Sequence, residues 1–361
     1  MRHPDGKLNW LNSKGKVGDK LIAVWGIHND ALSDELVEEG FISIGWSAIP
    51  DIRSIGSDRD SLKRALSAAY PEAKAGAIPV WAGILYRFGF EMKEGDIVIA
   101  PYRADSTLNF GVITGGYEYL PEAPVHPHRR KVRWVKTGVS RGVFPQEALY
   151  EIGSAMTLFR VKKNVPVFMN FLDADTDSSA QEHLAVTDTQ TVDEWIETEP
   201  SAARLDQFTH DFILKTLLQD LSHEEFEHFT ADLLRAMGYQ ARVTSYTSDG
   251  GVDVIAHKDP LGLEPPVIKV QCKHTSAQQS RPDIQRLSGT LAHGELALFV
   301  CLGSFSKDAL GYERERQNLR LLTGAEVVEL TLENYDNLAP RWKTRIPLRQ
   351  VYVVDRASEG R

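Results

Sequence analysis

The chain has little of several features that would decide its class at once. Only two of its 361 residues are cysteines, Cys272 and Cys301, and both lie in apolar, strand-like runs. This argues against a disulfide scaffold and favours reduced thiols in a cytoplasm. No run approaches the roughly 18 uncharged apolar residues that a membrane helix needs, and the N-terminus lacks the apolar stretch of a secretory signal. We therefore expect a cytoplasmic protein with no membrane partner.

What is present is an ordinary globular composition with unevenly placed charge. Hydrophobic residues make up 42% of the chain and charged residues 25%, enough for sizeable cores, and the length suits two domains of roughly 150 residues each. The formal net charge is -9, and residues 172–206, with ten acids and one base, account for all of it. The rest of the chain is neutral overall, so the charge does not exclude a polyanion partner.

The acidic stretch indicates a division into two domains. Residues 171–206 are rich in Asp, Glu, Ser and Thr without a sustained apolar period, which predicts a linker. Residues 18–170 contain short β-branched and aromatic runs and one helical pattern over 57–70, so we expect a small mixed β domain, a compact barrel. Residues 207–355 open with helices and then alternate strands with helices, which is typical of an α/β layer fold.

The elements of the second domain follow from its caps and periods. Ser222 followed by Glu225 is a capping-box signature, predicting a helix that runs to Met237 and ends at Gly238. Further strands are expected at 251–256, 267–273, 296–302 and 325–330, and helices over 282–292 and 306–322.

Two of these strands carry polar side chains in an apolar setting. In VIKVQCKH, Gln271 and Lys273 share one face of the strand, opposite Val270 and Cys272. In GGVDVIA, Asp253 projects from an otherwise apolar strand. Because a half-buried carboxylate needs a cationic partner or a metal, Lys273 and a divalent ion are its candidate partners if the two strands pair.

Glu227, in the first turn of the predicted helix, is the third candidate. Together with Asp253 and the amide oxygen of Gln271 it would give a hard-oxygen site suited to Mg²⁺. Lys273 beside such a site would hold a phosphate oxygen or orient a water, and a metal ion next to a phosphodiester promotes hydrolysis. Structural roles also fit these residues: the helix dipole alone favours an acid at position 227, and Gln271 can serve only its neighbours.

The order of these segments resembles a known family. FEHFTADLLRAMGY, SDGGVDVIA and VQCK closely resemble the Mrr-type branch of the PD-(D/E)xK nuclease superfamily, over the chain from about Leu205 to Asp355. In that resemblance Glu227 matches the helix acid, Asp253 the metal-binding aspartate and Gln271 to Lys273 the QxK variant of the half-motif. It implies an α/β restriction-endonuclease-like fold and Mg²⁺-dependent cleavage of DNA. Gln271 in place of an acid removes one charge, which favours one metal ion over two.

The first domain is the candidate reader of the substrate. Five of the seven tryptophans lie in it or just before it, and rings at strand ends can sandwich a flipped or unpaired base. Its strand order and the segment MKEGDIVIAPY resemble an EVE or PUA-like barrel, which implies recognition of a modified base or a small nucleotide. We take Trp25, Trp46 and Asp51 as the candidate pocket, although a core position also fits most of the tryptophans.

Basic residues in both domains are candidates for phosphate contacts, which position DNA without reading its sequence. Arg316 and Arg320 are one helical turn apart if the predicted helix holds, so they would share a face. A solvated surface fits each candidate equally well. The candidates are Arg281, Arg286, Arg316 and Arg320 in the second domain, and Arg129 and Arg133 in the basic strip 129–141 of the first.

These observations lead to one hypothesis and its alternatives. The sequence predicts a Mg²⁺-dependent endonuclease acting on double-stranded, modified DNA in defence against foreign DNA, with the first domain reading the base. Cutting both strands needs two active sites, so we expect a homodimer or a higher homo-oligomer. The alternatives are a nuclease activated by a nucleotide signal, a DNA-binding protein with an inactive nuclease fold, and an enzyme for RNA or branched DNA.

Overall fold

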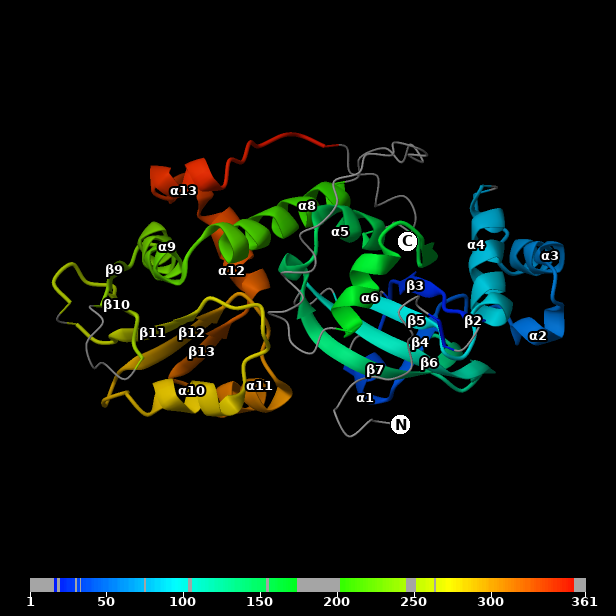
Figure 1. Ribbon diagram of the computed structural model, residues 1–361, viewed down its shortest axis with the longest axis horizontal. Coiled ribbons are helices and arrows are strands. Elements are labelled where there is room, and N and C mark those ends of the chain that lie inside the picture. The colour runs from blue at the N-terminus through cyan, green and yellow to red at the C-terminus, as the bar shows by residue number, and fades with distance from the viewer. Residues whose placement is uncertain are drawn as a thin grey trace. The chain divides into compact units, whose positions relative to one another are not determined.

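The chain divides into two compact units (Figure 1). The computed structural model describes residues 16–17, 20–29, 31–32, 34–74, 76–102, 106–153, 156–173, 202–244, 251–262 and 264–353. The first unit takes most of the chain before residue 180, and the second takes the remainder together with two earlier segments, Arg103–Thr107 and Gly138–Gln146. Most of the predicted linker, residues 174–201, lies outside the described residues. In the described part of the chain, no helix is long and apolar enough to cross a membrane.

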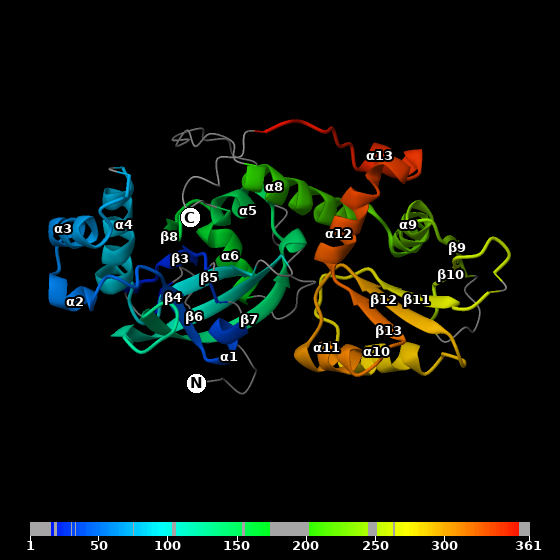
Figure 2. The same cartoon turned by 180° about the vertical axis from the view of Figure 1, so that it is seen from behind.

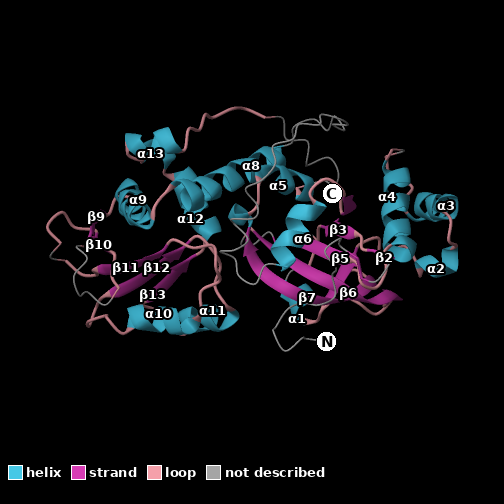
Figure 3. Cartoon of the chain, viewed as in Figure 1, coloured by secondary structure: helices cyan, strands magenta, loops and turns pink. Residues whose placement is uncertain are grey.

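The first unit is built on a curled sheet. Its elements are β1 (Lys16–Val17), β2 (Lys20–Leu21), β3 (Val24–Ile27), α1 (Asp34–Glu38), β4 (Phe41–Ile44), α2 (Ile52–Ile55), α3 (Arg59–Ala69), α4 (Ala77–Tyr86), the π-helical turn η1 (Arg87–Glu91), β5 (Ile97–Tyr102), β6 (Thr107–Tyr119), β7 (His128–Ser140), α5 (Gln146–Ile152), β8 (Leu158–Val161) and α6 (Val165–Asp173). Six strands form one mixed sheet in the order β4-β7-β6-β5-β3-β8. The long strands β6 and β7 curl strongly (Figure 3), so the sheet forms half a barrel, and the predicted barrel-like fold is confirmed.

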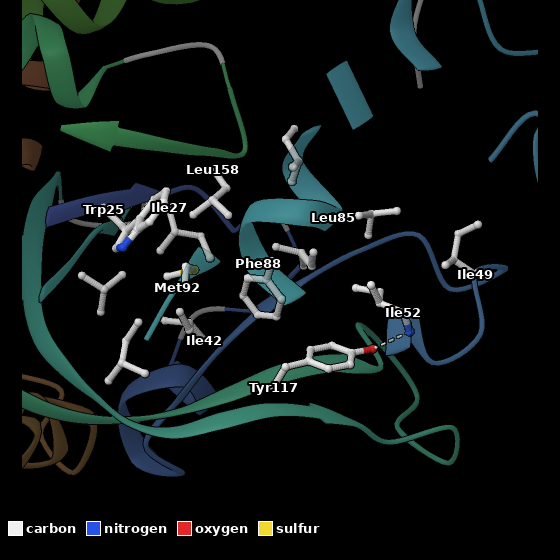
Figure 4. Close-up of a cluster of buried hydrophobic side chains, with 14 of the residues drawn as sticks. Trp25, Ile27, Ile42, Ile49, Ile52, Leu85, Phe88, Met92, Tyr117 and Leu158 are labelled. Carbon is white, nitrogen blue, oxygen red and sulfur yellow. Dashed lines mark hydrogen bonds between the residues drawn. The ribbon is translucent and has the colours of Figure 1, made fainter. Parts of the chain in front are cut away.

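The core of this unit explains why buried and exposed side chains do not alternate along its short strands. All four residues of both β3 and β4 are buried, because apolar side chains cover both faces of the sheet. On one face, Trp25, Ile42 and Phe88 belong to a single large cluster (Figure 4). Helix α6 packs against β6, where the ring of Phe110 lies 5.3 Å from that of Phe171.

The second unit is an α/β sandwich. It comprises the 3₁₀ turn η2 (Arg141–Val143), α8 (Ala202–Lys215), the π-helical turn η3 (Thr216–Asp220), α9 (His223–Ala236), β9 (Gln240–Val243), β10 (Val254–His257), β11 (Ile268–Lys273), α10 (Arg281–Ser288), β12 (Leu296–Cys301), α11 (Lys307–Arg314), β13 (Leu319–Leu322), α12 (Gly324–Glu333), the 3₁₀ turn η4 (Tyr335–Asn337) and α13 (Pro340–Arg345). Its strands form a sheet in the order β13-β12-β11-β10-β9. Strands β11, β12 and β13 run parallel, whereas β10 is antiparallel to β9 and β11. Helices α9 and α12 cover one face and α10 and α11 the other, as the view from behind also shows (Figure 2).

Two predictions for this unit are wrong near its C-terminal end. Residues 325–330, predicted as a strand, belong to helix α12, which a capping box at Thr323 and Glu326 begins. The helix predicted over 306–322 ends at Arg314, and Leu319–Leu322 form strand β13. Short apolar runs fit a helix or a strand equally well, and pairing with β12 decided the second case.

Candidate active site

Pairing of β10 with β11 brings the predicted catalytic residues together. The antiparallel register sets Val254 opposite Val270, so Asp253, just before β10, lies opposite Gln271. The Asp253 backbone N–H donates to the Val270 carbonyl at 2.8 Å, and the Asp253 carboxylate accepts from the Cys272 backbone N–H at 2.7 Å. The two strands therefore pair. The two hydrogen bonds together hold Asp253 and its carboxylate against β11, the strand that carries Lys273.

Gln271 has an amide oxygen that its neighbours do not satisfy. Its Oε1 is buried and has no hydrogen-bond partner in the described part of the chain. On the amide nitrogen side, Gly251 has a φ of 89°, and a Cβ added there would lie 2.8 Å from the Gln271 Nε2. A buried acceptor without a donor costs about 1–3 kcal/mol, so this oxygen would gain from a donor or a cation that none of the described residues supplies.

Helix α9 supplies the third candidate, Glu227. The predicted capping box of Ser222 and Glu225 is present and begins the helix at His223. Glu227 therefore lies just after the first turn and not within it as predicted, and it is only 4% exposed. Burial raises the pKa of Glu227, and the negative charge of Asp253 raises it further. His223, one turn earlier, lies with its Nε2 3.3 Å from the Glu227 carboxylate. The sequence analysis missed His223, although its i, i+4 spacing to Glu227 was the available signal.

The electrostatics indicate that these groups share one small region. Burial raises the pKa of Asp253, while the Cys272 N–H and the positive charges of His223 and Lys273 lower it. Glu227 and Asp253 are therefore both harder to ionise than exposed carboxylates, and a nearby cation would favour their charged forms. Lys273 is half-buried on the same face of β11 as Gln271, as the strand period predicts.

The donor set fits a hard divalent cation. Among the described residues, no group of three or more His, Cys, Asp and Glu side chains is placed to hold a metal ion. The cluster offers instead two carboxylates and one amide oxygen, and oxygen donors are those that Mg²⁺ prefers. The unpartnered Gln271 oxygen is the observation that favours such an ion. Asp249, which precedes this site, lies outside the described residues.

Two neighbours of Lys273 have structural roles. Cys272 is fully buried, and burial raises the pKa of its thiol, which leaves it unreactive. His274 donates from Nε2 to the Leu217 carbonyl at 2.9 Å, and burial lowers its pKa. His274 therefore ties the end of β11 to the η3 turn in its neutral form.

One cavity of this unit lies away from these residues. A hollow of about 470 Å³ between α9 and α12 is lined by apolar residues such as Leu298 and Val300. Glu326, Glu329 and Glu333 also line it, and their charge opposes a phosphate. None of the four candidate catalytic residues lines it, although Arg320 does, so it is separate from the candidate site.

Comparison with known proteins agrees with this geometry. Residues 218–331 match a family model described as a restriction endonuclease. This part of the chain is an Mrr-type restriction endonuclease domain. The type IV methyl-directed restriction enzyme EcoKMrr of Escherichia coli strain K12 is 30% identical to the chain over 138 residues, which are 36% of this chain and 44% of that enzyme. The match to EcoKMrr thus spans less than half of its length.

The part of the chain before the Mrr-type domain matches a different model. Residues 22–161 match a domain of unknown function (DUF8426), so the resemblance to an EVE or PUA-like barrel stays a prediction. Two solved structures show weak similarity. The MspJI restriction endonuclease in complex with a 27-mer oligonucleotide is 15% identical with a TM-score of 0.30, covering 92% of this chain and 73% of that one. The modification-dependent restriction endonuclease AspBHI is 14% identical with a TM-score of 0.32, covering 74% and 70%.

The predicted pocket of the first unit needs correction. Trp25 is only 2% exposed, and its indole N–H donates to Asp96 at 2.9 Å, so it is a core residue. Its place on β3, which is covered on both faces, explains this. Asp51 caps α2 and pairs with Arg53 at 2.7 Å, a role that accounts for its carboxylate without a ligand.

Trp46 keeps features of a binding residue. It is half-buried and has a φ of 63°, a conformation that costs a bulky residue about 1–2 kcal/mol. Its ring lies 6.0 Å from that of Trp81, which lies 5.7 Å from the ring of Tyr70. The backbone after β4 is held by side chains: Ala48 N–H donates to the Tyr70 hydroxyl, and the Trp46 carbonyl accepts from His128. Trp46 therefore sits on a supported loop beside other rings.

The basic strip of the first unit is less available than its sequence suggests. Arg129 contacts Glu39 and lies over the ring of Phe41. Arg130 is buried and donates to the carbonyls of Phe88, Gly89 and Gly115, and burial lowers its pKa to about 10. Arg133 is exposed and stays a candidate for a phosphate contact.

The four candidates of the second unit lie on its surface, each beside a partner. Arg281 pairs with Asp308 and Arg286 with Asp283, while Arg320 pairs with Glu313 and Glu326. Arg316 lies over the ring of Tyr312 at 4.2 Å. The predicted shared helical face of Arg316 and Arg320 is wrong, because α11 ends at Arg314 and Arg320 belongs to β13.

Proposed function

We propose that this protein is a Mg²⁺-dependent DNA endonuclease of the modification-dependent, type IV-like kind, that it acts in the cytoplasm, and that its first unit reads the modified base. The observation that carries the catalytic half is the buried, unpartnered oxygen of Gln271 between Asp253 and Lys273. The methyl-directed activity in the name of the relative EcoKMrr supports the second half.

The residues of the site have separable roles in this proposal. Asp253, Gln271 and Glu227 would hold the ion, which when bound polarises the phosphoryl group and lowers the pKa of a water. The Cys272 N–H holds the Asp253 carboxylate in one orientation. The Lys273 ammonium adds a positive charge where the phosphate accumulates negative charge, which stabilises the transition state. Because Gln271 replaces an acid, we propose one ion and not two.

The first unit supports the reading half of the proposal through Trp46. The Trp46 indole is only partly buried and lies beside Trp81 and Tyr70, and base–aromatic stacking contributes about 1–3 kcal/mol per base. The substrate is double-stranded DNA, and one catalytic set cuts one strand. We therefore propose that a homodimer or higher homo-oligomer cuts both strands.

The test is a cleavage assay on matched DNA samples, unmodified or carrying methyl, hydroxymethyl or glucosylated cytosine, with and without Mg²⁺. Wild type is compared with Lys273→Ala, and Lys269→Ala is the matched control. Lys269 lies on the same face of the same strand but pairs with Glu295 at 2.7 Å, away from the catalytic set. Cutting confined to modified DNA, lost in Lys273→Ala and kept in Lys269→Ala, supports both halves.

The other outcomes overturn one half at a time. Mg²⁺-dependent cutting that ignores modification removes the base-reading role and favours a soluble nucleotide as ligand of the first unit. DNA band shifts without cutting in any sample remove the nuclease and leave a binding protein. Cutting of RNA or branched DNA in preference to the duplex corrects the substrate class.

A further inference from the structure

The nuclease unit contains a segment that lies far before the matched domain. Gly138–Gln146 belongs to the second unit, although the restriction endonuclease model begins at residue 218. Its residues 139–144, which comprise the end of β7, the η2 turn and Phe144, are all buried, which is unusual where a strand ends in a turn. We call Gly138–Phe144 the clip.

On one side, the clip is bound to α8 and η3. The Arg141 guanidinium donates two hydrogen bonds to the Asp211 carboxylate, at 2.6 and 2.8 Å, and both side chains are only 4% exposed. Gln219 of η3 donates to the Gly142 carbonyl at 2.9 Å. A Cβ at Gly142 would lie 3.1 Å from the side chain of Leu218 in η3. The backbone of the clip therefore approaches η3 closely.

On the other side, the clip is bound to the loop that follows β12. The Ser140 hydroxyl donates to the Leu302 carbonyl at 3.4 Å, and the Ser304 hydroxyl donates to the Gly138 carbonyl at 3.0 Å. Gly138 has a φ of 65°, and a Cβ there would lie 2.9 Å from the Ser304 hydroxyl oxygen. A side chain at position 138 would therefore separate the clip from this loop.

The two partners of the clip flank the end of the catalytic strand. Lys273 is the register partner of Cys301, which directly precedes Leu302. His274, the next residue after Lys273, donates to the Leu217 carbonyl of η3. The end of β11 is thus attached to both of the structures that the clip holds together.

We propose that the clip positions Lys273, with Arg141 as its central positioning residue. This inference rests on the proposed hydrolysis at Lys273. Without Arg141, Asp211 is a buried charge with no cation beside it, which is strongly unfavourable, so α8 and η3 must move to hydrate it. His274 carries that movement to Lys273, and a misplacement of about 1 Å in an active site lowers the rate roughly 100-fold.

The clip also ties the nuclease unit to the first half of the sequence. It begins within β7, whose earlier residues belong to the sheet of the first unit. The catalytic strand is therefore supported by residues from both sides of the predicted linker.

The experiment compares full-length wild type with Arg141→Ala and Arg141→Lys. Arg341→Ala is the matched control, because Arg341 also pairs with a largely buried aspartate, Asp232, in the same unit but contacts neither the clip nor β11. Cleavage of DNA is measured as kcat and KM at a temperature where circular dichroism shows each variant folded. Hydrogen–deuterium exchange of peptides covering 270–276 is measured without DNA.

A positioning role predicts a selective change. Arg141→Ala should lower kcat roughly 10- to 100-fold with KM for DNA unchanged, and it should speed exchange at 270–276. Arg141→Lys should recover part of both, and Arg341→Ala should lower the unfolding temperature alone. Because exchange needs no cleavage, it decides the proposal even if wild type cuts no DNA.

The contrary result is equally clear. A folded Arg141→Ala protein with wild-type kcat and wild-type exchange at 270–276 reduces the clip to a contribution to stability and overturns the proposal. If Arg141→Ala does not fold, Ser304→Ala, which removes only the hydrogen bond to Gly138, takes its place. Wild-type kcat and exchange in both Ser304→Ala and Arg141→Lys then overturn the proposal in the same way.

Discussion

The carboxylate of Asp253 accepts a hydrogen bond from the backbone N–H of Cys272, 2.7 Å away on the neighbouring strand. This contact orients the acid by the backbone of the strand whose side chains, Gln271 and Lys273, complete the site. A site built on paired strands is held more tightly than one built on loops. The negative charge of Asp253 can therefore be tested separately from the hydrogen bond that holds its side chain in the fold.

Asp253→Asn should separate them. The amide oxygen of Asn can still accept from the Cys272 N–H, so the fold should persist. We expect cleavage to fall by at least ~100-fold, since the proposed metal ion loses one of its two anionic ligands. The unfolding temperature at pH 7 should be equal or higher, because burial disfavours the Asp253 charge. Parallel cleavage and thermal unfolding measurements check this, and a variant that loses activity only by unfolding would contradict it.

Gly251→Ala should disturb the Gln271 amide. A Cβ at Gly251 would lie 2.8 Å from the Gln271 Nε2, whereas one at Gly294 would meet nothing within 4 Å. The two glycines have similar φ values, 89° and 81°, so Gly294→Ala carries the same backbone strain in open space. We expect each variant to lose about 1 kcal/mol or more of stability, but only Gly251→Ala to weaken Mg²⁺ binding by calorimetry. Equal metal affinity in both variants would exclude Gln271 as a ligand.

The Arg141–Asp211 pair should show strong coupling. Removing one partner of a buried pair costs about 3–5 kcal/mol, whereas replacing both with apolar residues of similar volume is often neutral. We therefore expect Arg141→Met and Asp211→Leu to be strongly destabilised singly and the double variant to lie nearer to wild type. Urea unfolding of all four proteins gives the coupling free energy. Additive losses in the double variant would refute the pairing energetics.

His128 should make the first unit sensitive to acid. Burial lowers its pKa from 6.5 to about 4. Between these two pH values, His128 is protonated in the unfolded chain but neutral in the folded unit. The stability linked to His128 is therefore complete above pH 6.5 and is lost as the pH falls towards 4, by about 3 kcal/mol. Unfolding temperatures between pH 7 and 4 should fall less steeply in His128→Gln than in wild type. Identical slopes would show that another group governs the acid response.

The two tryptophans of the predicted pocket should behave in opposite ways. Trp25 is buried in the core, so Trp25→Ala should destabilise the first unit by about 3–5 kcal/mol. Trp46→Ala keeps the same positive φ and removes a partly buried ring that packs at the edge of the core, so it should cost less stability than Trp25→Ala and should abolish the preference for modified DNA. Competition binding with modified and unmodified duplexes measures this. An unchanged preference would remove Trp46 from the reading role.

Several features were within reach of the sequence because they depend on neighbours along the chain. The capping box at Ser222 and Glu225 specifies where α9 begins, and hence which turn carries Glu227. The period of β11 places Gln271 and Lys273 on one face, away from Val270. Helix-capping hydrogen bonds and the alternation of side chains along a strand both depend on residues that are close in sequence. They can therefore be predicted from the sequence directly.

Other features were decided by contacts between distant segments. Nothing near Trp25 distinguishes a pocket from a core, and its burial follows from coverage of both faces of β3. Whether Leu319–Leu322 is a helix end or a strand depended on pairing with β12. Arg141 stands in a basic strip along the sequence, yet its charge is matched by Asp211, 70 residues away.

By itself, the sequence determined which residues form the candidate site, because Asp253, Gln271, Lys273 and Glu227 sit in locally specified elements of a recognisable order. Only the tertiary structure decided which oxygen of that set has no donor among the described residues, which arginines are already paired, and that a segment from before the linker belongs to the second unit. The physical reason is that burial and pairing are properties of the assembled core, where a residue's partners come from any part of the chain.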